Sequence, residues 1–441
     1  MGQSNGRDRA LSALLAFDRG RDKADEALDA ALSPLKDPRE KALATRIFYG
    51  VIQNLSLLDF YISAFSSLKK NKISPSVLWI LRIGMYQLVF LDRVPKSAAV
   101  DTSVTLAKRY ANPRAASFVN AVLRKASGGG LPQVPETDKA SFLSLKYSHP
   151  LWLVSRFLSL FGARNTERLL ADNNGVCPTA LRVNTLKGTV ENAEAALLAA
   201  GIRVGRHPFA EHCLVAENSG FFEETGPVQN GLVYVQDPSS QLCVEALSPE
   251  PGSKVVDLCA APGGKSVLCA QIMENKGQVL SLDINENKIK MIEQNAKRLG
   301  ASVIKTEVSD ALSLREDLLS SADFVVCDVP CSGFGVIRKK PDIRFKTRED
   351  VASLPEMQRR ILENASRYVK KGGFLLYSTC TILPEENEEV VNAFLADHPE
   401  FSPEPFSAGK IRSETGMQLL LPYTFETDGF FFAKIKNRSG E

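Results

Sequence analysis

Residues 255–265 read V-V-D-L-C-A-A-P-G-G-K, and this stretch decides the fold that the sequence predicts. Its first three residues form the apolar end of a buried strand, and Gly263 and Gly264 follow in a turn. Glycines there let the backbone approach a ligand without side-chain obstruction, and a helix start beyond them offers free N–H groups. A glycine-rich turn placed after a strand indicates a nucleotide-like cofactor.

Strands and helices alternate on the carboxyl side of this turn. Helices are predicted over 286–299 and 355–369, between further strands. The predicted strands cover 255–257, 279–283, 303–308, 324–328 and 374–378. This alternation favours a Rossmann-like α/β domain, with a parallel sheet covered by helices on both faces. A last strand over 429–435 follows a loop rather than a crossover helix, and we expect it to pair antiparallel at the sheet edge.

The amino-terminal part of the chain has a different pattern. Residues 8–126 contain helical apolar stripes separated by Pro residues that stand where helices begin, so we expect an all-α bundle. A linker, S-G-G-G-L-P-Q-V-P, follows at 127–135. Between 138 and 245 the patterns indicate helices and then a small α+β segment with strands near 179–184, 202–204 and 232–235. The predicted domains are therefore 1–127, a linker at 128–137, a small segment at 138–245 and the cofactor domain at 246–441.

Composition and charge narrow the class of protein. The 441 residues are 44% hydrophobic and 24% charged, which is typical of globular chains. No apolar run approaches the roughly 18 residues that a membrane helix needs, and no signal peptide is visible, so we expect a cytoplasmic protein and a monomer. The eight cysteines include no C-x-x-C pair and do not cluster with the four histidines, so we expect reduced thiols and no metal.

The charge is unevenly distributed. Residues 1–130 carry 20 Lys/Arg and 11 Asp/Glu, a net +9 in a chain of net +3, so the remainder carries −6. Within 69–125 the count is 11 basic against 2 acidic residues. A basic amino-terminal module suggests a polyanion partner, with Arg109 and Arg114 as candidate RNA contacts. A solvated helical surface is the alternative interpretation of the same charges.

Two carboxylates after the following strands narrow the cofactor. Asp283 ends the second strand, where an acid grips ribose hydroxyls, and Asp310 follows the third strand, where it can meet an adenine amino group. The turn lacks the G-x-G-x-x-G pattern of NAD sites. It is not a phosphate-binding Walker loop either, because position 259 is Cys rather than Gly. A ligand with adenosine but no phosphates fits better, which favours S-adenosylmethionine.

Two cysteines stand at strand ends in the same domain. Cys331 lies in D-V-P-C-S-G (328–333) and Cys380 in Y-S-T-C (377–380). Cytosine C5 accepts a methyl group only after a thiolate has added at C6, and a base must then remove the C5 proton. Cys380, Cys331 and Asp328 can supply the nucleophile, the helper and an acid or hydrogen-bond donor for the N3/N4 edge of the ring. A buried structural Cys is the usual alternative, which we assign to Cys259, Cys269 and Cys327.

A basic run, G-V-I-R-K-K-P-D-I-R (335–344), continues from Cys331. Beside an active site such a run would hold the phosphates of a polynucleotide, and a solvated loop is the alternative. The candidate RNA contacts in it are Arg338, Lys339, Lys340 and Arg344.

Taken together, these motifs resemble the RNA cytosine-C5 methyltransferase family, also called the Nol1/Nop2/Sun family. The resemblance rests on the stretches 259–265, 328–342 and 379–387, with L-R-V-N-T-L at 181–186 and V-Q-D-P-S-S-Q at 235–241. The helical segment, ending in N-P-R-A-A-S-F-V-N-A-V-L-R-K at 112–125, resembles a NusB-like RNA-binding bundle. The order of the two is the layout of the bacterial RsmB (Sun/Fmu) type, which modifies a cytosine of 16S rRNA.

The resemblance implies a role for individual residues. It implies Cys380 as the attacking nucleophile and Cys331 as the residue that assists release. The S-adenosylmethionine site that it implies comprises Cys259, Ala260, Ala261, Pro262, Gly263, Gly264, Lys265, Asp283, Asp310 and Asp328. Phe334 stands where the family commonly has a smaller residue, so we expect it to alter how the base is packed and with it the fine substrate preference.

Other functions remain open at this point. A DNA cytosine-C5 methyltransferase would use the Pro-Cys thiol and need no Thr-Cys. An amino-group methyltransferase would carry a second Pro and an aromatic residue after Asp328, and this chain has V-P-C. A non-catalytic RNA-binding or ribosome assembly factor with a relic cofactor domain, and an enzyme acting on another RNA such as tRNA, are further alternatives.

Overall fold

The computed structural model describes residues 5–20, 23–217 and 222–440. The chain forms two compact units, each described by itself below. One unit comprises Met1–Gly175 together with Lys339–Phe345, and the other comprises Val176–Arg338 together with Lys346–Glu441. Among the described residues no helix is long and apolar enough to cross a membrane.

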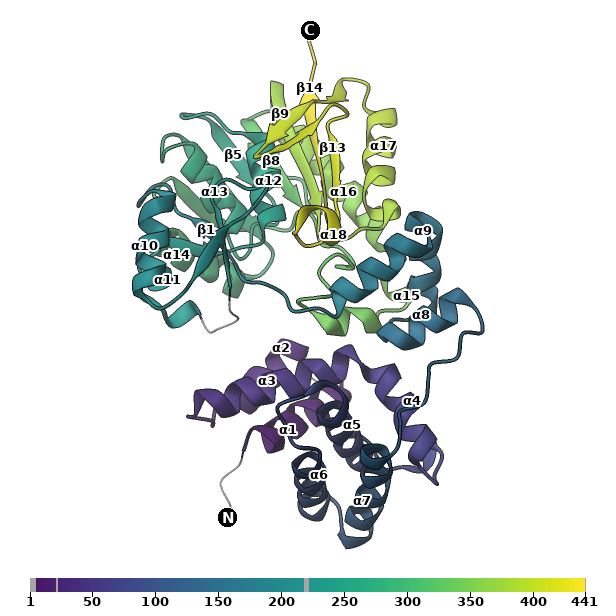
Figure 1. Ribbon diagram of the computed structural model, residues 1–441. Helices are drawn as coiled ribbons and strands as arrows, with labels where there is room; N and C mark the ends of the chain where they lie inside the picture. The colour runs from purple at the N-terminus through teal and green to yellow at the C-terminus, as the bar shows by residue number, and fades with distance from the viewer. Residues whose placement is uncertain (1–4, 21–22, 218–221, 441) are drawn as a thin grey trace. The chain divides into compact units, whose positions relative to one another are not determined.

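The first unit is helical, as the sequence predicts (Figure 1). Several of its helices begin where a polar residue caps a Pro start: the Asp37 side chain accepts the Arg39 N–H, and the Asn112 side chain accepts the Ala115 N–H. The elements are α1 (Gly6–Asp18), α2 (Ala24–Leu32), α3 (Pro38–Gln53), α4 (Leu55–Phe65), η1 (Lys70–Lys72), α5 (Pro75–Phe90), α6 (Lys96–Tyr110), α7 (Pro113–Gly128), α8 (Lys139–Tyr147), α9 (Leu151–Asn173) and η4 (Pro341–Phe345).

The core of this unit is built around α5, whose apolar residues face the surrounding helices. Ile80, Leu81 and Ile83 are fully buried there. Helices α3 and α5 approach so closely that a Cβ on Gly50 would lie about 2.0 Å from the Tyr86 ring, so only glycine fits at position 50. Burial of this apolar surface, which the helical stripes of the sequence encode, stabilises the bundle.

Arg344 has a structural role in this unit, which corrects its assignment as an RNA contact. The residue is 1% exposed. Its guanidinium donates to the carbonyls of Pro341 (3.0 Å), Ser148 (3.1 Å) and Gln53, and to the Asn174 side chain (3.0 Å). Burial lowers the pKa of Arg344 to about 9. A guanidinium enclosed in this way is not available to a phosphate, because its donors already satisfy protein carbonyls.

The second unit begins with a small antiparallel sheet in the order β2-β3-β1-β4. Its strands are β1 (Ala180–Val183), β2 (Val204–Arg206), β3 (Cys213–Ala216) and β4 (Val233–Val235), and its helices are α10 (Val190–Ala199), η2 (Phe222–Glu224) and α11 (Gly226–Gln229). Strand β3 was not predicted. Its sequence, Cys-Leu-Val-Ala, is only four residues long and lacks the alternation that marks a half-buried strand.

The larger sheet of this unit has the order β10-β14-β9-β8-β5-β6-β7, with β13 also paired to β14. Its elements are α12 (Pro238–Leu247), β5 (Lys254–Asp257), α13 (Gly264–Ile272), β6 (Gln278–Asp283), α14 (Glu286–Leu299), β7 (Ile304–Val308), η3 (Glu316–Leu318), β8 (Ala322–Asp328), α15 (Arg348–Val351), α16 (Leu354–Tyr368), β9 (Val369–Thr379), η5 (Pro384–Glu386), α17 (Glu388–Asp397), β10 (Phe401–Pro403), β11 (Phe406–Ala408), β12 (Ile411–Ser413), β13 (Met417–Leu420), α18 (Pro422–Phe425) and β14 (Phe430–Asn437). Strands β5 to β9 are parallel, so the predicted Rossmann-like sheet is confirmed.

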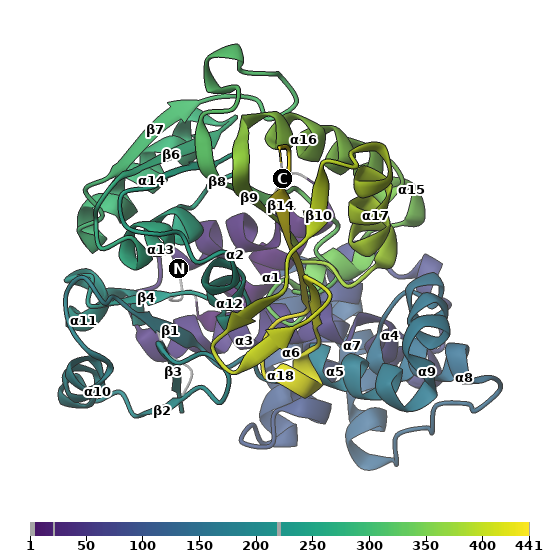
Figure 2. The ribbon, with the colours of Figure 1, turned by 90° about the horizontal axis from the view of Figure 1, so that it is seen from above.

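Side chains alternate between the two faces of this sheet, and helices cover both faces (Figure 2). Val255 and Val326 belong to one core, together with apolar residues of α12 and α13. Val256 and Val325 belong to the other core, with residues of α16 and α17. Burial on both faces explains why these strands read as continuous apolar runs in the sequence.

The last strand differs from its prediction in one respect. β14 pairs antiparallel with β9, as expected, but β10 and β13 also pair with β14, so β14 is not at the sheet edge. The strands β10 and β13 have three and four residues, too few to give a clear period in the sequence.

Candidate active site

The two predicted thiols come together at the carboxyl ends of β8 and β9. These strands are parallel neighbours, with Asp328 opposite Ser378 in the register. Cys331 follows β8 by three residues and Cys380 follows β9 directly. Their Sγ atoms lie 3.1 Å apart, and both residues are partly buried. Strand pairing therefore brings two cysteines that are 49 residues apart in sequence into hydrogen-bonding contact.

Short backbone contacts fix the chain on either side of the two thiols. The Gly335 N–H donates to the Cys380 carbonyl at 3.0 Å, and the Gly429 N–H donates to the Gly335 carbonyl at 2.9 Å. A Cβ on Gly335 would lie about 1.8 Å from the Gly429 carbonyl oxygen, so only glycine allows this approach. The Ser332 and Thr381 hydroxyls are 2.7 Å apart, next to the thiols. The two cysteine-bearing loops are thus locked to each other.

The two thiols are electrostatically coupled. The hydrogen bond with Cys380 raises the pKa of the Cys331 thiol well above its ordinary value, and burial and the nearby Glu386 and Asp328 carboxylates act in the same direction. The raised pKa favours the protonated form of the Cys331 thiol.

Asp328 lies at the end of β8, beside the thiols. Its carboxylate accepts a hydrogen bond from the Ser378 hydroxyl (2.7 Å) and pairs with the Lys265 ammonium (2.6 Å). Burial would lower the pKa of Lys265, but Asp328 and other neighbouring acids outweigh burial and raise it, so Lys265 stays charged. The sequence places Lys265 in the cofactor loop, and its side chain extends from that loop to Asp328.

The predicted cofactor loop connects β5 to α13. Gly263 has φ +98° and precedes the helix start, where no side chain caps the first N–H groups. A Cβ on Gly264 would lie about 2.7 Å from the Gln236 amide nitrogen and 3.1 Å from the Tyr234 ring. The glycines are therefore required by a positive φ and by tight packing against the segment around β4, in addition to any approach by a ligand.

The carboxylates predicted for the cofactor lie after the neighbouring strands. Asp283 ends β6, and its carboxylate accepts the N–H groups of Ala261 (3.3 Å) and Asn285 (3.2 Å). Asp310 follows β7 and accepts the Leu312 N–H at 2.9 Å. This arrangement fits an adenosine-bearing ligand that also has a carboxylate group. The Asp283 carboxylate can accept hydrogen bonds from ribose hydroxyls, and the N–H groups at the helix start can bind the ligand's carboxylate.

The sequence interpretation missed several residues at this end of the sheet. Ile284 is 64% exposed directly after Asp283, although it is a large apolar side chain. An apolar surface in that position fits the face of an adenine ring. Glu386 and Gln358 are buried and hold the loop of Cys331, as described below. An exposed Ile beside a predicted ribose-binding acid was a signal for the first of these, while the sequence contains no signal for Gln358, which reaches the site from α16.

A buried acid network lies under the cofactor loop. Asp257 is fully buried at the end of β5, and its carboxylate accepts the Ser266 hydroxyl at 2.6 Å. The Ser281 hydroxyl donates to Ser266 at 2.8 Å. Burial raises the pKa of Asp257 to about 7, despite the hydrogen bond from Ser266 and the nearby Lys265 charge. This acid therefore changes its charge near neutral pH.

The remaining basic candidates are placed as follows. Arg338 is largely buried and pairs with Asp428 at 3.6 Å. Lys340 is exposed and pairs with Asp25 at 3.6 Å, and Lys339 is exposed. Arg109 pairs with the buried Asp8 at 2.8 Å, whereas Arg114 is exposed at the start of α7.

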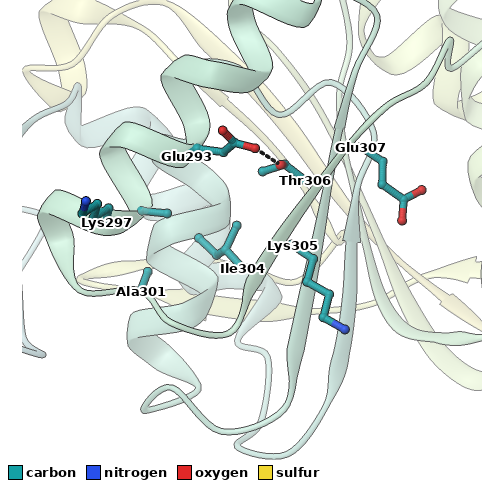
Figure 3. Close-up of a pocket in the computed structure, with 8 residues that line it drawn as sticks. Glu293, Lys297, Ala301, Ile304, Lys305, Thr306 and Glu307 are labelled. Carbon is teal, nitrogen blue, oxygen red and sulfur yellow. Dashed lines mark hydrogen bonds between the residues drawn. The ribbon is translucent and has the colours of Figure 1, made fainter.

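A cavity of about 510 Å³ lies between α14 and the edge strand β7 and contains none of the predicted site residues (Figure 3). Its lining carries charges of both signs, and the Thr306 hydroxyl donates to Glu293 at 2.8 Å. Lys305 and Glu307 stand on the exposed edge strand, where charged side chains discourage pairing with another chain. We interpret this cavity as a protected sheet edge.

Comparisons with known proteins identify related families and structures. The family model for the 16S rRNA methyltransferase RsmB/F matches residues 244–436, the NusB family model matches 4–127, and a Methyltr_RsmF/B-like ferredoxin-like domain matches 149–220. The chain is 37% identical to the probable ribosomal RNA small subunit methyltransferase B of Bacillus subtilis, over 99% of this chain and 100% of the relative. A relative of the same description from Synechocystis is 35% identical over 93% of this chain and 95% of its own length.

Solved structures extend the comparison. The crystal structure of PH0851 matches with a TM-score of 0.83 and 29% identity, covering 99% of both chains. A methyltransferase homolog protein from Pyrococcus horikoshii matches with a TM-score of 0.59 and 31% identity, over 67% of this chain and 97% of its own.

We expect Asp257→Asn to stabilise the protein increasingly as the pH rises. The folded-state pKa of Asp257 is raised to about 7, so the native protein holds this proton more tightly than the unfolded chain does, and that advantage is lost as the pH rises from about 4 through 7. The asparagine side chain does not titrate, so the variant does not lose stability in this way as the pH rises. Urea unfolding at pH 5 and pH 8 should show a relative gain for the variant of about 2–3 kcal/mol over this interval.

The matched control is Asp317→Asn, which removes an exposed carboxylate of the same unit and should show no such gain. An equal stability difference between Asp257→Asn and the parent protein at both pH values would contradict the assignment of a buried acid that titrates near neutral pH.

Proposed function

This chain belongs to the 16S rRNA methyltransferase RsmB/F family, and on that premise we propose that it transfers a methyl group from S-adenosylmethionine to C5 of a cytosine in 16S rRNA. The observation that carries the proposal is the pair of thiols, Cys331 and Cys380, with their Sγ atoms 3.1 Å apart at the carboxyl ends of adjacent parallel strands. Ligands of open α/β sheets bind at this end of the strands.

Cys380 is the attacking group. Its thiolate adds to C6 of the ring, so an S–C6 bond forms and the electron pair of the C5–C6 double bond makes C5 nucleophilic. S-adenosylmethionine, when bound, would supply an electrophilic methyl group on its sulfonium: the C5–CH3 bond would form as the S–CH3 bond breaks, with its electron pair left on a neutral thioether. A general base removes the C5 proton, the C5–C6 double bond re-forms, and the electron pair of the S–C6 bond returns to Cys380.

Cys331 assists the release of the product. Its thiol keeps its proton because its pKa is raised, and it lies within hydrogen-bonding contact of the Cys380 sulfur. The S–H group can therefore donate to the Cys380 sulfur as negative charge returns to it. Stabilising the departing thiolate in this way lowers the barrier to its departure.

Asp328 and Lys265 orient the base. The Asp328 carboxylate is held by Lys265 and by the Ser378 hydroxyl within the same strand ends as the thiols. An ionic carboxylate accepts hydrogen bonds and does not donate them, so its partner on cytosine is the exocyclic amino group. This assignment replaces a proton-donating role for Asp328 by an accepting one.

The cofactor is held by the loop after β5. The N–H groups at the start of α13 and the Asp283 and Asp310 carboxylates would hold its polar ends, with Ile284 against the adenine ring. Cys259 is the least suited of the predicted loop residues to bind through its side chain, because burial strongly raises the pKa of its thiol and keeps it neutral. We assign its contribution to the backbone.

Ribosomal RNA is the partner that the family implies. We therefore place the protein in the cytoplasm, where that RNA is made and assembled, and we propose that it acts as a monomer. Among the basic candidates of residues 1–130, Arg114 is exposed, whereas Arg109 has a structural partner in the buried Asp8. Lys339 and Lys340 are exposed and remain candidates for phosphate contacts.

We expect Cys380→Ala to abolish methyl transfer, because no thiol is left to activate C5, while S-adenosylmethionine binding is retained. Cys331→Ala should methylate and then stall, because the departing Cys380 thiolate has lost its hydrogen-bond donor. Labelled methyl transfer onto unmodified 16S rRNA, followed by a denaturing gel, measures both outcomes. The Cys331→Ala lane should contain a protein–RNA adduct that is absent from the Cys380→Ala lane.

Cys177→Ala serves as the control, since Cys177 is a cysteine that lies outside the predicted site and forms no disulfide. Persistent turnover in Cys380→Ala would refute the nucleophile. A parent protein that binds rRNA but transfers no methyl group would favour an assembly factor, and methylation of tRNA in preference to 16S rRNA would redirect the substrate.

We expect Arg114→Glu to weaken binding to 16S rRNA fragments and to reduce the slope of log K against log salt by about one, because one phosphate contact is lost. Filter binding at several salt concentrations measures both quantities. Lys371→Glu is the matched charge reversal, at the start of β9 and therefore at the opposite end of that strand from Cys380. Equal affinities for the two variants and the parent would mean that the Arg114 surface is only solvated.

A further inference from the structure

Glu386 is a buried acid beside the two thiols to which neither the family comparison nor the mechanism above assigns a role. It ends η5 and is 2% exposed. One carboxylate oxygen, Oε2, accepts the backbone N–H of Ser332 at 2.8 Å and the Gln358 amide at 2.9 Å. The other oxygen, Oε1, is buried without a hydrogen-bond partner among the described residues.

Glu386 and Gln358 together clamp the peptide groups on both sides of Cys331. Gln358 donates to the Pro330 carbonyl at 3.0 Å, and Glu386 accepts from the Ser332 N–H. The acid itself is fixed, because the Tyr377 hydroxyl donates to the Glu386 carbonyl oxygen at 2.6 Å. The position of the Cys331 sulfur therefore depends on one carboxylate that reaches it from a different element.

The groups that face Cys331 are mostly acidic. Cys380 and Tyr377 approach it from β9, Asp328 from β8 and Glu386 from η5. A cation also contacts the Cys331 loop: the Lys346 ammonium donates to the Ser332 carbonyl at 2.7 Å. The Lys265 charge is paired with Asp328.

A carboxylate charge has a strong effect here because it is buried. With little water to screen it, a negative group beside a thiol disfavours a second negative charge on the sulfur. Glu386 and Asp328 both raise the pKa of Cys331, after the larger effects of the Cys380 hydrogen bond and of burial. Asp328 is compensated by Lys265, whereas the side-chain partners of Glu386 among the described residues are dipoles, the Ser332 N–H and the Gln358 amide.

We propose that Glu386 is a positioning residue that selects the nucleophile: it holds Cys331 next to Cys380 and keeps the proton on Cys331, so that Cys380 alone attacks the pyrimidine. This inference rests on the proposed two-thiol reaction. In the resting site the Cys331 S–H donates to the Cys380 sulfur, and the negative charge stays on the Cys380 sulfur. The same arrangement is restored when the product leaves.

The test measures the reactivity of Cys331 without RNA or cofactor, so its outcome is independent of turnover. In the full-length Cys380→Ser protein, which keeps a hydrogen-bonding group at position 380, alkylation of Cys331 by iodoacetamide is followed by peptide mass spectrometry from pH 7 to 10.5. We expect Glu386→Gln, which can still accept the Ser332 N–H, to move the midpoint of this pH profile downward. The alkylation rate at pH 8.5 should rise about tenfold, the factor that one pKa unit gives.

The matched control is Glu389→Gln, an exposed glutamate on the neighbouring helix α17, whose profile should coincide with that of the parent. A merely looser loop would raise the limiting rate at high pH and leave the midpoint in place, so an unchanged midpoint in Glu386→Gln overturns the proposal whatever the plateau does. A lowered midpoint supports it.

A second arm separates this inference from the proposed function. With both cysteines intact, Glu386→Gln should methylate 16S rRNA more slowly than Glu389→Gln, and some of the covalent RNA should be attached at Cys331. Absence of methyl transfer in the parent protein would defeat the proposed function while leaving the alkylation result standing. Normal turnover of Glu386→Gln together with an adduct only at Cys380 would defeat the role of Glu386.

Discussion

The parallel pairing of β8 with β9 is the constraint on which the site depends. Its register sets Asp328 opposite Ser378 and leaves both strands to end at the same level. The next residues of each strand then meet, which gives the Sγ–Sγ distance of 3.1 Å between Cys331 and Cys380. At that distance one thiol can donate a hydrogen bond to the other sulfur, and in the proposed mechanism the surrounding acids keep the proton on Cys331.

The small antiparallel sheet contacts the cofactor loop through Arg182. Arg182 of β1 is 1% exposed, and its guanidinium donates to the Gly264 carbonyl at 2.7 Å and packs over the Tyr234 ring. Burial lowers the pKa of Arg182 to about 10. Removing a guanidinium from water costs free energy, which the hydrogen bond to the Gly264 carbonyl and the contact with the Tyr234 ring partly offset. The α+β segment therefore contributes directly to the geometry of the cofactor loop.

Much of this architecture can be predicted from the sequence, because its signals are local. Apolar runs buried on both faces identified the strands β5 to β9, and Pro starts identified the helices of the first unit. The thiols were recognisable because each follows such a run. Arg344 was wrongly assigned as an RNA contact because the residues of a basic run are usually exposed to solvent. Only the fold shows that its guanidinium donates to the carbonyls of Gln53 and Ser148.

Contacts between distant segments could not be predicted. Gln358 reaches the Cys331 loop from α16, and Glu386 reaches it from η5. The requirement for Gly335 likewise depends on Gly429, which is 94 residues away in the sequence. Each of these contacts is set by tertiary packing, about which composition and periodicity carry no information.

The most direct test of the account is to trap the bond between protein and pyrimidine. An rRNA fragment carrying 5-fluorocytosine at the methylated position should accept the thiolate and the methyl group, but fluorine cannot leave as a cation, so the adduct should persist. Digestion and mass spectrometry would then locate the RNA. The account predicts attachment through the sulfur of Cys380. Attachment through Cys331, or no adduct from a protein that methylates ordinary rRNA, would contradict it.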